Sequence, residues 1–397
     1  MKIRKNLNVI IMLIIVLLPF IYYGNIIFSG KMLYGTDWID AGGYIKRAFV
    51  ENAQDRYGEF PLWNPNVFTG IPTGEGFLGD IFYPISLFLK LFLPLFIAWT
   101  LIFVIHPVFA GIGMYLFIKE KIKNRWIGLF AAIVYMFTSV ILSETYAGHD
   151  GRVIVACYLP LLIYFLDRGF HMKRIGYFGI ASLIASLMLL SGHIQSSYYA
   201  IVLGIFYISF IHINNEYKHR FRNYTWLAAL LIGFLFSFID RYVGFGAFVL
   251  LIIFSPILLD REFQRTSVKI YGGLLLFIIL TAVISAVQYM PILRYLPYTA
   301  RGLSRGYSYA TSWSMGLSEI VDMVFPGFTG ITQEGMNSYW GANPFKLHFR
   351  YIGIIPMLLA LSAIFLKKKS AIEKFMIISF FTGIIIALGG DTPIYRI

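Results

Sequence analysis

The sequence predicts an all-α polytopic membrane protein. Its 397 residues are 58% hydrophobic and only 13% charged, and the mean hydropathy is +0.72. Soluble domains carry about 25% charged residues, so a chain this poor in charge is built to lie in lipid. The single cysteine, Cys157, lies in an apolar run and can form neither an internal disulfide nor a zinc ribbon. We expect this thiol to be a small core residue.

Apolar runs of about 20 residues are needed to cross a hydrocarbon core of about 30 Å. The first run follows three basic residues and lacks a small-residue cleavage site, which predicts an uncleaved anchor. Several runs are short, which leaves open that one pair is re-entrant. About eleven transmembrane helices are predicted, near residues 7–28, 96–118, 126–142, 153–166, 175–190, 199–213, 225–239, 242–259, 270–290, 351–366 and 375–390.

Basic residues accumulate on the cytoplasmic side of membrane proteins because they resist translocation. With a cytoplasmic N-terminus, 20 of the 33 Lys and Arg residues fall on inner segments, in clusters that alternate along the chain. The net charge of +13 is therefore mainly an orientation signal, and nucleic-acid binding is not expected. We predict a multi-pass protein of the cell membrane, with residues 1–397 forming a single transmembrane domain.

Two outer segments, 29–95 and 291–350, are too long to be simple turns. Long connections in compact proteins are usually functional or disordered. The acidic and aromatic residues of the first segment argue against a disordered tether. An enzyme or a transporter with a solvent-facing site would carry that site in these two segments.

The first outer segment begins with a predicted juxtamembrane helix, because apolar residues recur at helical spacing after Asp37. Asp37 is a candidate N-cap of that helix. It is also a candidate catalytic carboxylate, which could accept a proton from an incoming nucleophile at the lipid–water boundary. The two roles are compatible, and Asp40 is the next candidate. The apolar positions are Trp38, Ile39, Ile45 and Phe49.

The stretch PLWNPNVFTGIPTGEGFLGDIFYP continues this segment and has the composition of a compact ordered loop. Glu75 and Asp80 are candidates for a second carboxylate or, with Asp37, for ligands of a divalent cation such as Mg or Mn. Such a hard cation needs only one or two carboxylates plus phosphate oxygens. The alternative is that these acids are simply solvated. Trp63 could stack on a sugar ring, or could belong to an interfacial aromatic belt.

Short polar clusters occur on the same predicted side. The turn SETYAGHDGR brings together Glu144, His149, Asp150 and Arg152. A neighbouring His–Asp pair can orient a base or bind a metal, although a solvated cluster is the alternative. His193 and Gln195 lie near a helix end, where polar groups tend to line cavities or to form hydrogen bonds between helices.

The second outer segment is rich in cations on the side where the positive-inside rule disfavours them. Arg matches phosphate geometry with two parallel hydrogen bonds and stays charged when partly buried. This pattern suggests a clamp for a lipid phosphate, or contact with anionic headgroups. Trp340 lies here in a stretch whose composition resembles that around Trp63. The basic candidates are Arg294, Arg301, Arg305, Lys346, His348 and Arg350.

No P-loop, dinucleotide-binding fingerprint, HExxH or GxSxG motif occurs in the chain. A soluble nucleotide therefore has no obvious pocket, and an enzyme working on the outer face would need a donor already present in the membrane. The competing interpretations are a transporter or flippase for lipid-linked glycans and a non-catalytic envelope-assembly protein. A transporter predicts mid-span charges and repeated halves, and neither stands out in the sequence.

Several long motifs resemble the YfhO family of bacterial membrane proteins, whose members look like GT-C-type glycosyltransferases. The motifs are YGTDWID, FPLWNPNVFTGIPTGEGFLGDIFYP, YAGHDGRVIVACYLPLLIYFLDRG, SGHIQSSYYA, GYSYATSWSMGLSEIVDMVFPGF and SYWGANPFKLHFRYIGIIP.

The resemblance implies a GT-C-like bundle, a polyprenyl-phosphate-linked sugar as donor and a cell-envelope glycan or lipid as acceptor. It also implies that an aspartate of the first outer loop acts as the base, and Asp37 occupies that position. Family members usually continue beyond the equivalent of Ile397. The chain is therefore expected to be either the N-terminal part of a longer architecture or an abbreviated member of the family.

Overall fold

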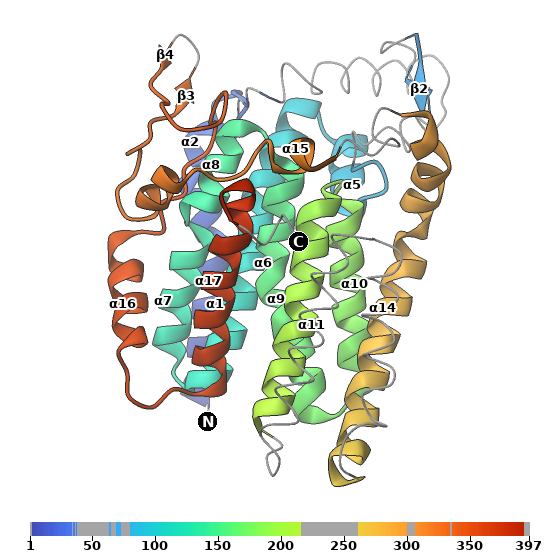
Figure 1. The fold of residues 1–397 in the computed structure, drawn as a ribbon, viewed down its shortest axis with the longest axis vertical. Coiled ribbons are helices and arrows are strands. Elements are labelled where there is room, and N and C mark those ends of the chain that lie inside the picture. Colours follow the sequence, from blue (N-terminus) through green and yellow to red (C-terminus); the bar gives the residue numbers. More distant parts are fainter. Residues whose placement is uncertain are drawn as a thin grey trace.

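The computed structural model shows a bundle of long helices that run along a common direction (Figure 1). Most of the described chain is helical, and its only strands are two pairs of two-residue strands. The structure describes residues 2–33, 35, 37, 63–64, 69–72, 80–215, 261–299, 306–333 and 336–392.

The helices follow one another with short turns between α6 and α11. The helical elements are α1 (Lys2–Tyr22), α2 (Gly24–Ile27), α5 (Pro84–Phe92), α6 (Leu95–Ile122), α7 (Arg125–Met136), α8 (Ser139–Ala147), α9 (Asp150–Met172), α10 (Ile175–Leu190), α11 (Ile194–Asn215), α14 (Arg261–Tyr295), α15 (Gly306–Thr311), α16 (Ile354–Ile364) and α17 (Ala371–Ala387).

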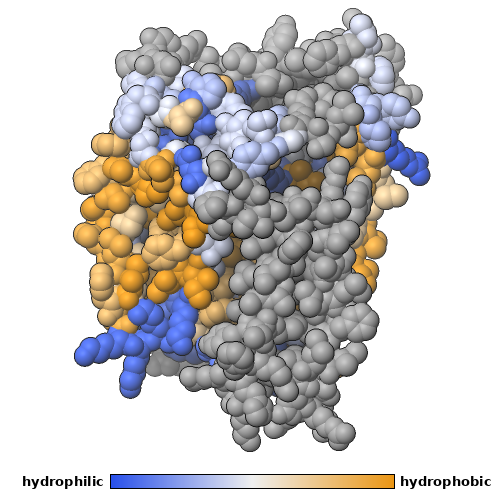
Figure 2. Space-filling model, in the orientation of Figure 1, coloured by the Kyte–Doolittle hydropathy of each residue, from blue (hydrophilic) through white to orange (hydrophobic). Residues whose placement is uncertain are grey.

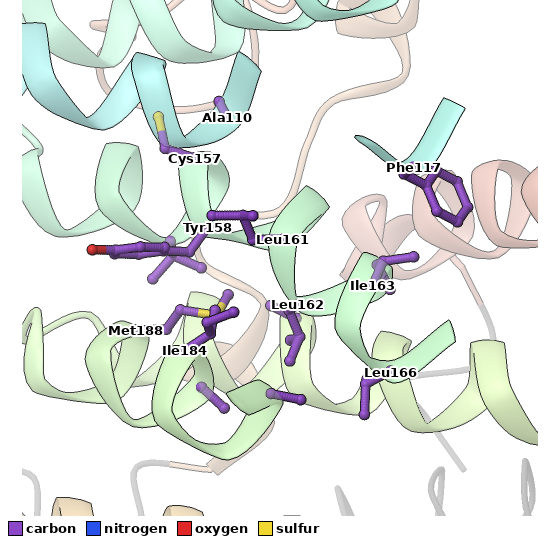
Figure 3. Packing of buried hydrophobic residues seen from close by; sticks show 14 of the residues in the cluster. Ala110, Phe117, Cys157, Tyr158, Leu161, Leu162, Ile163, Leu166, Ile184 and Met188 are labelled. Atoms are coloured by element: carbon purple, nitrogen blue, oxygen red, sulfur yellow. The ribbon is translucent and has the colours of Figure 1, made fainter. Parts of the chain in front are cut away.

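Helix α9 is the centre of the bundle and contacts α6, α8, α10, α11 and α14. Figure 3 shows its apolar side chains between α6 and α10, with Cys157 on the side of α6 and Leu162 near Ile184 of α10. Cys157 is fully buried, in agreement with its predicted role as a small core residue. At Gly113 of α6, a Cβ would lie 2.6 Å from the backbone nitrogen of Leu161, so this glycine permits the close packing of α6 on α9.

Five helices in the described part of the chain are long and apolar enough to cross a membrane. Figure 2 shows a broad hydrophobic band around the middle of the molecule, with hydrophilic surface at both ends. The predicted spans 225–239 and 242–259 lie outside the described residues. The five helices cover Phe96–Ile122, Arg125–Ala147, Asp150–Met172, Ile194–His212 and Val268–Tyr298.

Helices also occur at the shorter predicted spans. Leu7–Tyr22, Ile175–Leu190 and Ile354–Ile364 are shorter apolar helices, and α17 covers most of 375–390. The predicted span 126–142 is divided into α7 and α8 at Phe137 and Thr138, where the backbone leaves the helical conformation.

One end of the bundle carries the N-terminus and the α6–α7, α9–α10 and α16–α17 connections (Figure 1). These are basic segments that the charge pattern assigned to the inner side. Ion pairs join neighbouring helices there, with 2.6 Å between Lys121 Nζ and Asp167 Oδ1 and 2.8 Å between Arg168 Nη1 and Glu120 Oε1. Tyr207 of α11 donates a further hydrogen bond of 2.6 Å to Asp167.

The opposite end carries the α8–α9 turn, α5 and a folded segment after α14 (Figure 1). The first outer segment contains helix α5, which the sequence interpretation treated as loop, and a pairing of β1 (Trp63–Asn64) with β2 (Ile71–Pro72). The predicted juxtamembrane helix after Asp37 lies outside the described residues.

The second outer segment is organised by short elements. Helix α14 leads into the 3-10 helix η2 (Leu296–Tyr298), and α15 is followed by the 3-10 helix η3 (Leu317–Met323). Strands β3 (Thr332–Gln333) and β4 (Met336–Asn337) form an antiparallel pair. The 3-10 helix η4 (Gly389–Asp391) ends the described chain beside this segment, where Met315 N donates to Ala387 O at 2.8 Å.

Candidate functional site

Asp37, His149 and Glu144 form a hydrogen-bonded row at the end of the bundle opposite the basic connections. His149 Nε2 lies 2.7 Å from Asp37 Oδ2, and His149 Nδ1 lies 2.6 Å from Glu144 Oε2. The Asp37 side chain is 44% exposed, whereas that of Glu144 is 11% exposed. Asp37 Oδ1 has no hydrogen-bond partner within the described ranges. The row therefore runs from an accessible carboxylate to a buried one.

Glycines bring the Asp37 segment against the turn that carries His149. Gly148 ends α8 in the left-handed conformation, with φ of +81°. A Cβ on Gly35 would lie 2.5 Å from the Cα of Gly148, a distance that real side chains do not tolerate. The two backbones can approach this closely only because Gly35 lacks a Cβ, and the positive φ of Gly148 is one that glycine adopts without strain. This crossing places Asp37 beside His149.

Arg152, in the first turn of α9, extends the row to the α10–α11 turn. Its Nη1 donates to Glu144 Oε1 at 3.1 Å, and its Nε donates to His193 Nε2 at 3.2 Å. Gly151 permits this approach, because a Cβ there would lie 2.9 Å from Ser191 O. The sequence-predicted candidates Asp37, His149, Arg152 and His193 thus belong to one connected cluster.

His348 joins the cluster from the second outer segment. The stretch around it lies along α8, where Ser143 Oγ donates to Phe349 O at 3.3 Å and Ser139 Oγ donates to Tyr351 O. His348 is close enough to Glu144 and Arg152 to interact with their charges. Residues of the second outer segment therefore lie beside the cluster.

The histidines of the cluster differ in their electrostatic surroundings. Burial by itself lowers the pKa of His149, but the hydrogen bonds and charges of Glu144 and Asp37 outweigh burial and raise it above the ordinary value. Burial and the positive charges of Arg152 and His149 lower the pKa of His193 to about 4. Burial also lowers the pKa of His348 to about 4, against the opposing charge of Glu144. Of these three histidines, only His149 has a pKa raised above its ordinary value.

Two of the basic candidates in the second outer segment, Lys346 and Arg350, form ion pairs with acidic residues. Lys346 Nζ lies 2.7 Å from Asp322 Oδ2, and both side chains are almost fully buried. Arg350 Nε lies 2.8 Å from Glu319 Oε2. The other oxygen of Glu319, Oε1, accepts a hydrogen bond of 2.6 Å from Tyr339 OH. Both cations therefore balance buried carboxylates. Sequence reasoning missed this pairing, although Glu319 and Asp322 lie in the same segment.

Other candidates lie apart from the cluster or have local partners. Asp80 is buried and accepts hydrogen bonds from Ser86 and from Lys90, whose Nζ lies 2.7 Å from Oδ1. The remaining described candidates are Asp150, whose Oδ1 accepts from Gly151 N at 2.9 Å; Gln195, which donates to Tyr199 OH at 3.3 Å; Trp340, which donates to Phe328 O at 2.9 Å; and the exposed Trp63 and Arg294.

Four candidates, Asp40, Glu75, Arg301 and Arg305, lie outside the described residues. Among the residues that are described, no group of three or more His, Cys, Asp and Glu side chains has the geometry to hold a metal ion. Of the three metal-ligand candidates, Asp37 contacts His149 and Asp80 contacts Lys90, while Glu75 belongs to the segment that is not described.

Sequence reasoning also missed a buried polar chain beneath the first outer segment. His106 Nδ1 lies 2.6 Å from Ile102 O, so this nitrogen donates and Nε2 accepts a hydrogen bond of 2.6 Å from Tyr83 OH. Tyr158 OH is 2.9 Å from Tyr83 OH. The chain ties the residue before α5 to α6 and α9. Its only signal in the sequence is a histidine inside an apolar span.

Comparisons of the chain with family models, with curated proteins and with solved structures returned no match. The chemistry of the site is therefore argued from its own geometry. An accessible carboxylate can accept a proton, and the guanidinium of Arg152 in the same row can bind an anion. The cluster unites a base and a cation at one end of an apolar bundle.

Proposed function

We propose that this protein is a membrane glycosyltransferase. It would move a sugar from a polyprenyl-phosphate donor to a cell-envelope glycan or lipid acceptor. The proposed reaction is that of GT-C-type enzymes, and the proposed family is the YfhO family. The observation that carries the proposal is the Asp37–His149–Glu144–Arg152 row, which joins an accessible carboxylate to a cation. It lies at the end of the bundle away from the basic connections.

The proposed topology has about eleven transmembrane helices in a GT-C-like bundle, including the spans 225–239 and 242–259. The N-terminus is cytoplasmic, and the site opens to the outer face of the cell membrane. Support comes from the grouping of the basic connections at one end of the molecule, which is the arrangement expected from the positive-inside rule. A donor dissolved in the outer leaflet would meet the site at the membrane surface.

In the proposed reaction, Asp37 Oδ1 accepts the proton of an acceptor hydroxyl. The hydroxyl oxygen forms a bond to the anomeric carbon as the bond from that carbon to the phosphate oxygen breaks, with inversion. The bond electrons leave with the polyprenyl phosphate. Arg152 is bound to Glu144 in the same row, and its charge would stabilise the departing phosphate.

The test is the variant Asp37→Asn, assayed in membranes supplied with a radiolabelled polyprenyl-phosphate sugar. General-base catalysis contributes about 100-fold or more, so transfer should fall by at least that factor. The matched control is Asp391→Asn, which neutralises an exposed carboxylate at the end of α17 and should leave transfer unchanged. Undiminished transfer by Asp37→Asn would remove Asp37 from the mechanism. Absence of transfer by the wild-type protein would favour a non-catalytic role.

A further inference from the structure

His149 is placed so that both of its ring nitrogens meet a carboxylate oxygen. The distances are 2.7 Å from Nε2 to Asp37 and 2.6 Å from Nδ1 to Glu144. A neutral imidazole has only one N–H, whereas carboxylates can only accept. Two hydrogen bonds need two protons, one between His149 and each acid. A neutral histidine between two ionised acids supplies only one proton. The three side chains together must therefore hold one more.

The groups around His149 decide where this extra proton resides. Arg152 faces Glu144 from α9 and holds that acid in its ionised form. His193, from the α10–α11 turn, has a donor 3.2 Å from each ring nitrogen, Arg152 Nε at Nε2 and Ser196 N at Nδ1. A neutral ring can accept only one of these two hydrogen bonds, and neither contact favours a second ring proton. His348, from the second outer segment, is half-buried and interacts with the charge of Glu144 and with the opposing charges of Arg350 and Arg152. His149 is the member of the cluster whose two nitrogens both face acceptors.

We propose that His149 is a positioning residue that holds a proton between Asp37 and Glu144 and thereby fixes the orientation of the Asp37 carboxylate through its Oδ2 atom. As an imidazolium, it donates one hydrogen bond to each acid and offsets their mutual repulsion. When His149 loses this proton, one of its ring nitrogens no longer carries a hydrogen atom but still faces a carboxylate oxygen. The Asp37 contact then opens, because Asp37 is the more exposed of the two acids.

The consequence for the site is a limited pH range. Asp37 must be ionised to accept a proton, so activity falls at low pH. The imidazolium must be present to hold Asp37, so activity also falls when the pH rises through the pKa of His149. The three side chains titrate as a coupled unit, and both limits belong to the group rather than to one residue. This statement about activity depends on the function proposed above, whereas the statement about the proton does not.

The first experiment measures the proton directly. The full chain, labelled with 15N-histidine and reconstituted in lipid nanodiscs, is titrated by NMR. The His149 ring signals are assigned among the seven histidines with the variant His149→Gln. At pH 6, the His149 ring should show two protonated nitrogens. A spectrum of a neutral ring at pH 6 in the wild-type protein would overturn the proposal.

Two variants test the source of the effect. Asp37→Asn and Glu144→Gln should each move the titration midpoint of His149 to lower pH by about one unit or more, because each removes an adjacent opposite charge. The control is Asp80→Asn, since Asp80 is paired with Lys90. That variant should leave the His149 midpoint in place. A midpoint that neither site variant moves would also overturn the proposal.

The second experiment follows transfer of the radiolabelled polyprenyl-phosphate sugar from pH 5 to pH 9. The alkaline limit of the wild-type profile should move to lower pH in Glu144→Gln and disappear in His149→Gln, whose rate should be lower throughout. A purely structural role predicts lower rates with an unchanged profile, which would contradict the proposal. A protonated His149 without any transfer would refute the proposed function alone. Asp37-dependent transfer with a neutral His149 would refute only the present inference.

Discussion

Glycines at three places determine which side chains meet at the site. Gly35 and Gly148 allow the Asp37 segment to cross the α8–α9 turn, and Gly151 allows the α10–α11 turn to approach α9. Each glycine lies within a few residues of a member of the cluster. At this scale the geometry depends on the absence of side chains as much as on the acids and bases themselves, because a single Cβ would separate the segments.

The variant Gly35→Ala tests this dependence. Its Cβ would lie 2.5 Å from Gly148 Cα, so we expect the 35–37 segment to shift and the Asp37–His149 contact to open. Transfer activity should fall at least tenfold, and the His149 titration midpoint should move to lower pH. Gly24→Ala is the control, because a Cβ at Gly24 meets nothing within 4 Å. Equal behaviour of the two variants would show that the crossing does not matter.

At the scale of elements, the second outer segment is held by buried ion pairs rather than by a helical core. Asp322 accepts hydrogen bonds from Thr329 N at 3.0 Å, from Thr329 Oγ1 and from Lys346 Nζ at 2.7 Å. Each oxygen of this carboxylate therefore has at least one donor. Burial raises the pKa of Asp322, but the hydrogen bonds from Lys346 and Thr329 outweigh burial and lower it below the ordinary value. This pair fixes the segment that carries His348.

Removing the negative charge of Asp322 should destabilise the 306–352 segment. Asp322→Asn leaves Lys346 buried without a counter-charge, which costs about 3–5 kcal/mol. We expect faster hydrogen exchange and proteolysis across 306–352, with the helices unaffected. The double variant Asp322→Asn with Lys346→Met should recover much of the protection, because no unpaired charge remains. Equal protection of the single and double variants would argue against the ion pair as the cause.

The same pair predicts the pH dependence of this segment. Because the pKa of Asp322 is lower in the folded protein, its contribution to stability is present above the unfolded pKa. That contribution is lost as the pH falls through the folded value. Hydrogen exchange in 306–352 should therefore accelerate in acid in the wild-type protein and depend less on pH in the double variant.

At the scale of the whole molecule, a hydrophobic band separates two unlike ends (Figure 2). One end holds basic connections and inter-helix ion pairs, and the other holds the Asp37 cluster and the second outer segment. A molecule with this polarity has one orientation in a bilayer that satisfies the positive-inside rule. The orientation proposed above places the cluster outside.

Cysteine labelling in intact cells tests that orientation. The native Cys157 is buried, so a membrane-impermeant maleimide should react only with an introduced cysteine. Ser312→Cys, at an exposed position of the second outer segment, should be labelled from outside. Lys368→Cys, exposed between α16 and α17, should be labelled only after the membrane is permeabilised. The reverse pattern would invert the topology and place the cluster in the cytoplasm.

The helices and the polarity of the bundle follow from local properties of the chain. Apolar runs predict where helices lie within the described residues, and basic clusters predict which connections share an end. The polar motifs also predict Asp37, His149, Arg152 and His193 as candidate site residues from residue type and position in the chain. Hydropathy and charge are properties of short segments, so the sequence alone determined these features.

Tertiary structure decided which of these side chains interact. The contact of Asp37 with His149 joins residues 112 positions apart. Lys346 pairs with Asp322, and Asp80 pairs with Lys90. No local sequence pattern shows that these charged residues bind each other rather than a ligand. Whether a cation meets a ligand or a buried carboxylate depends on packing between distant segments. That packing is set by close backbone approaches such as Gly35 on Gly148, which leave no signature in hydropathy or charge.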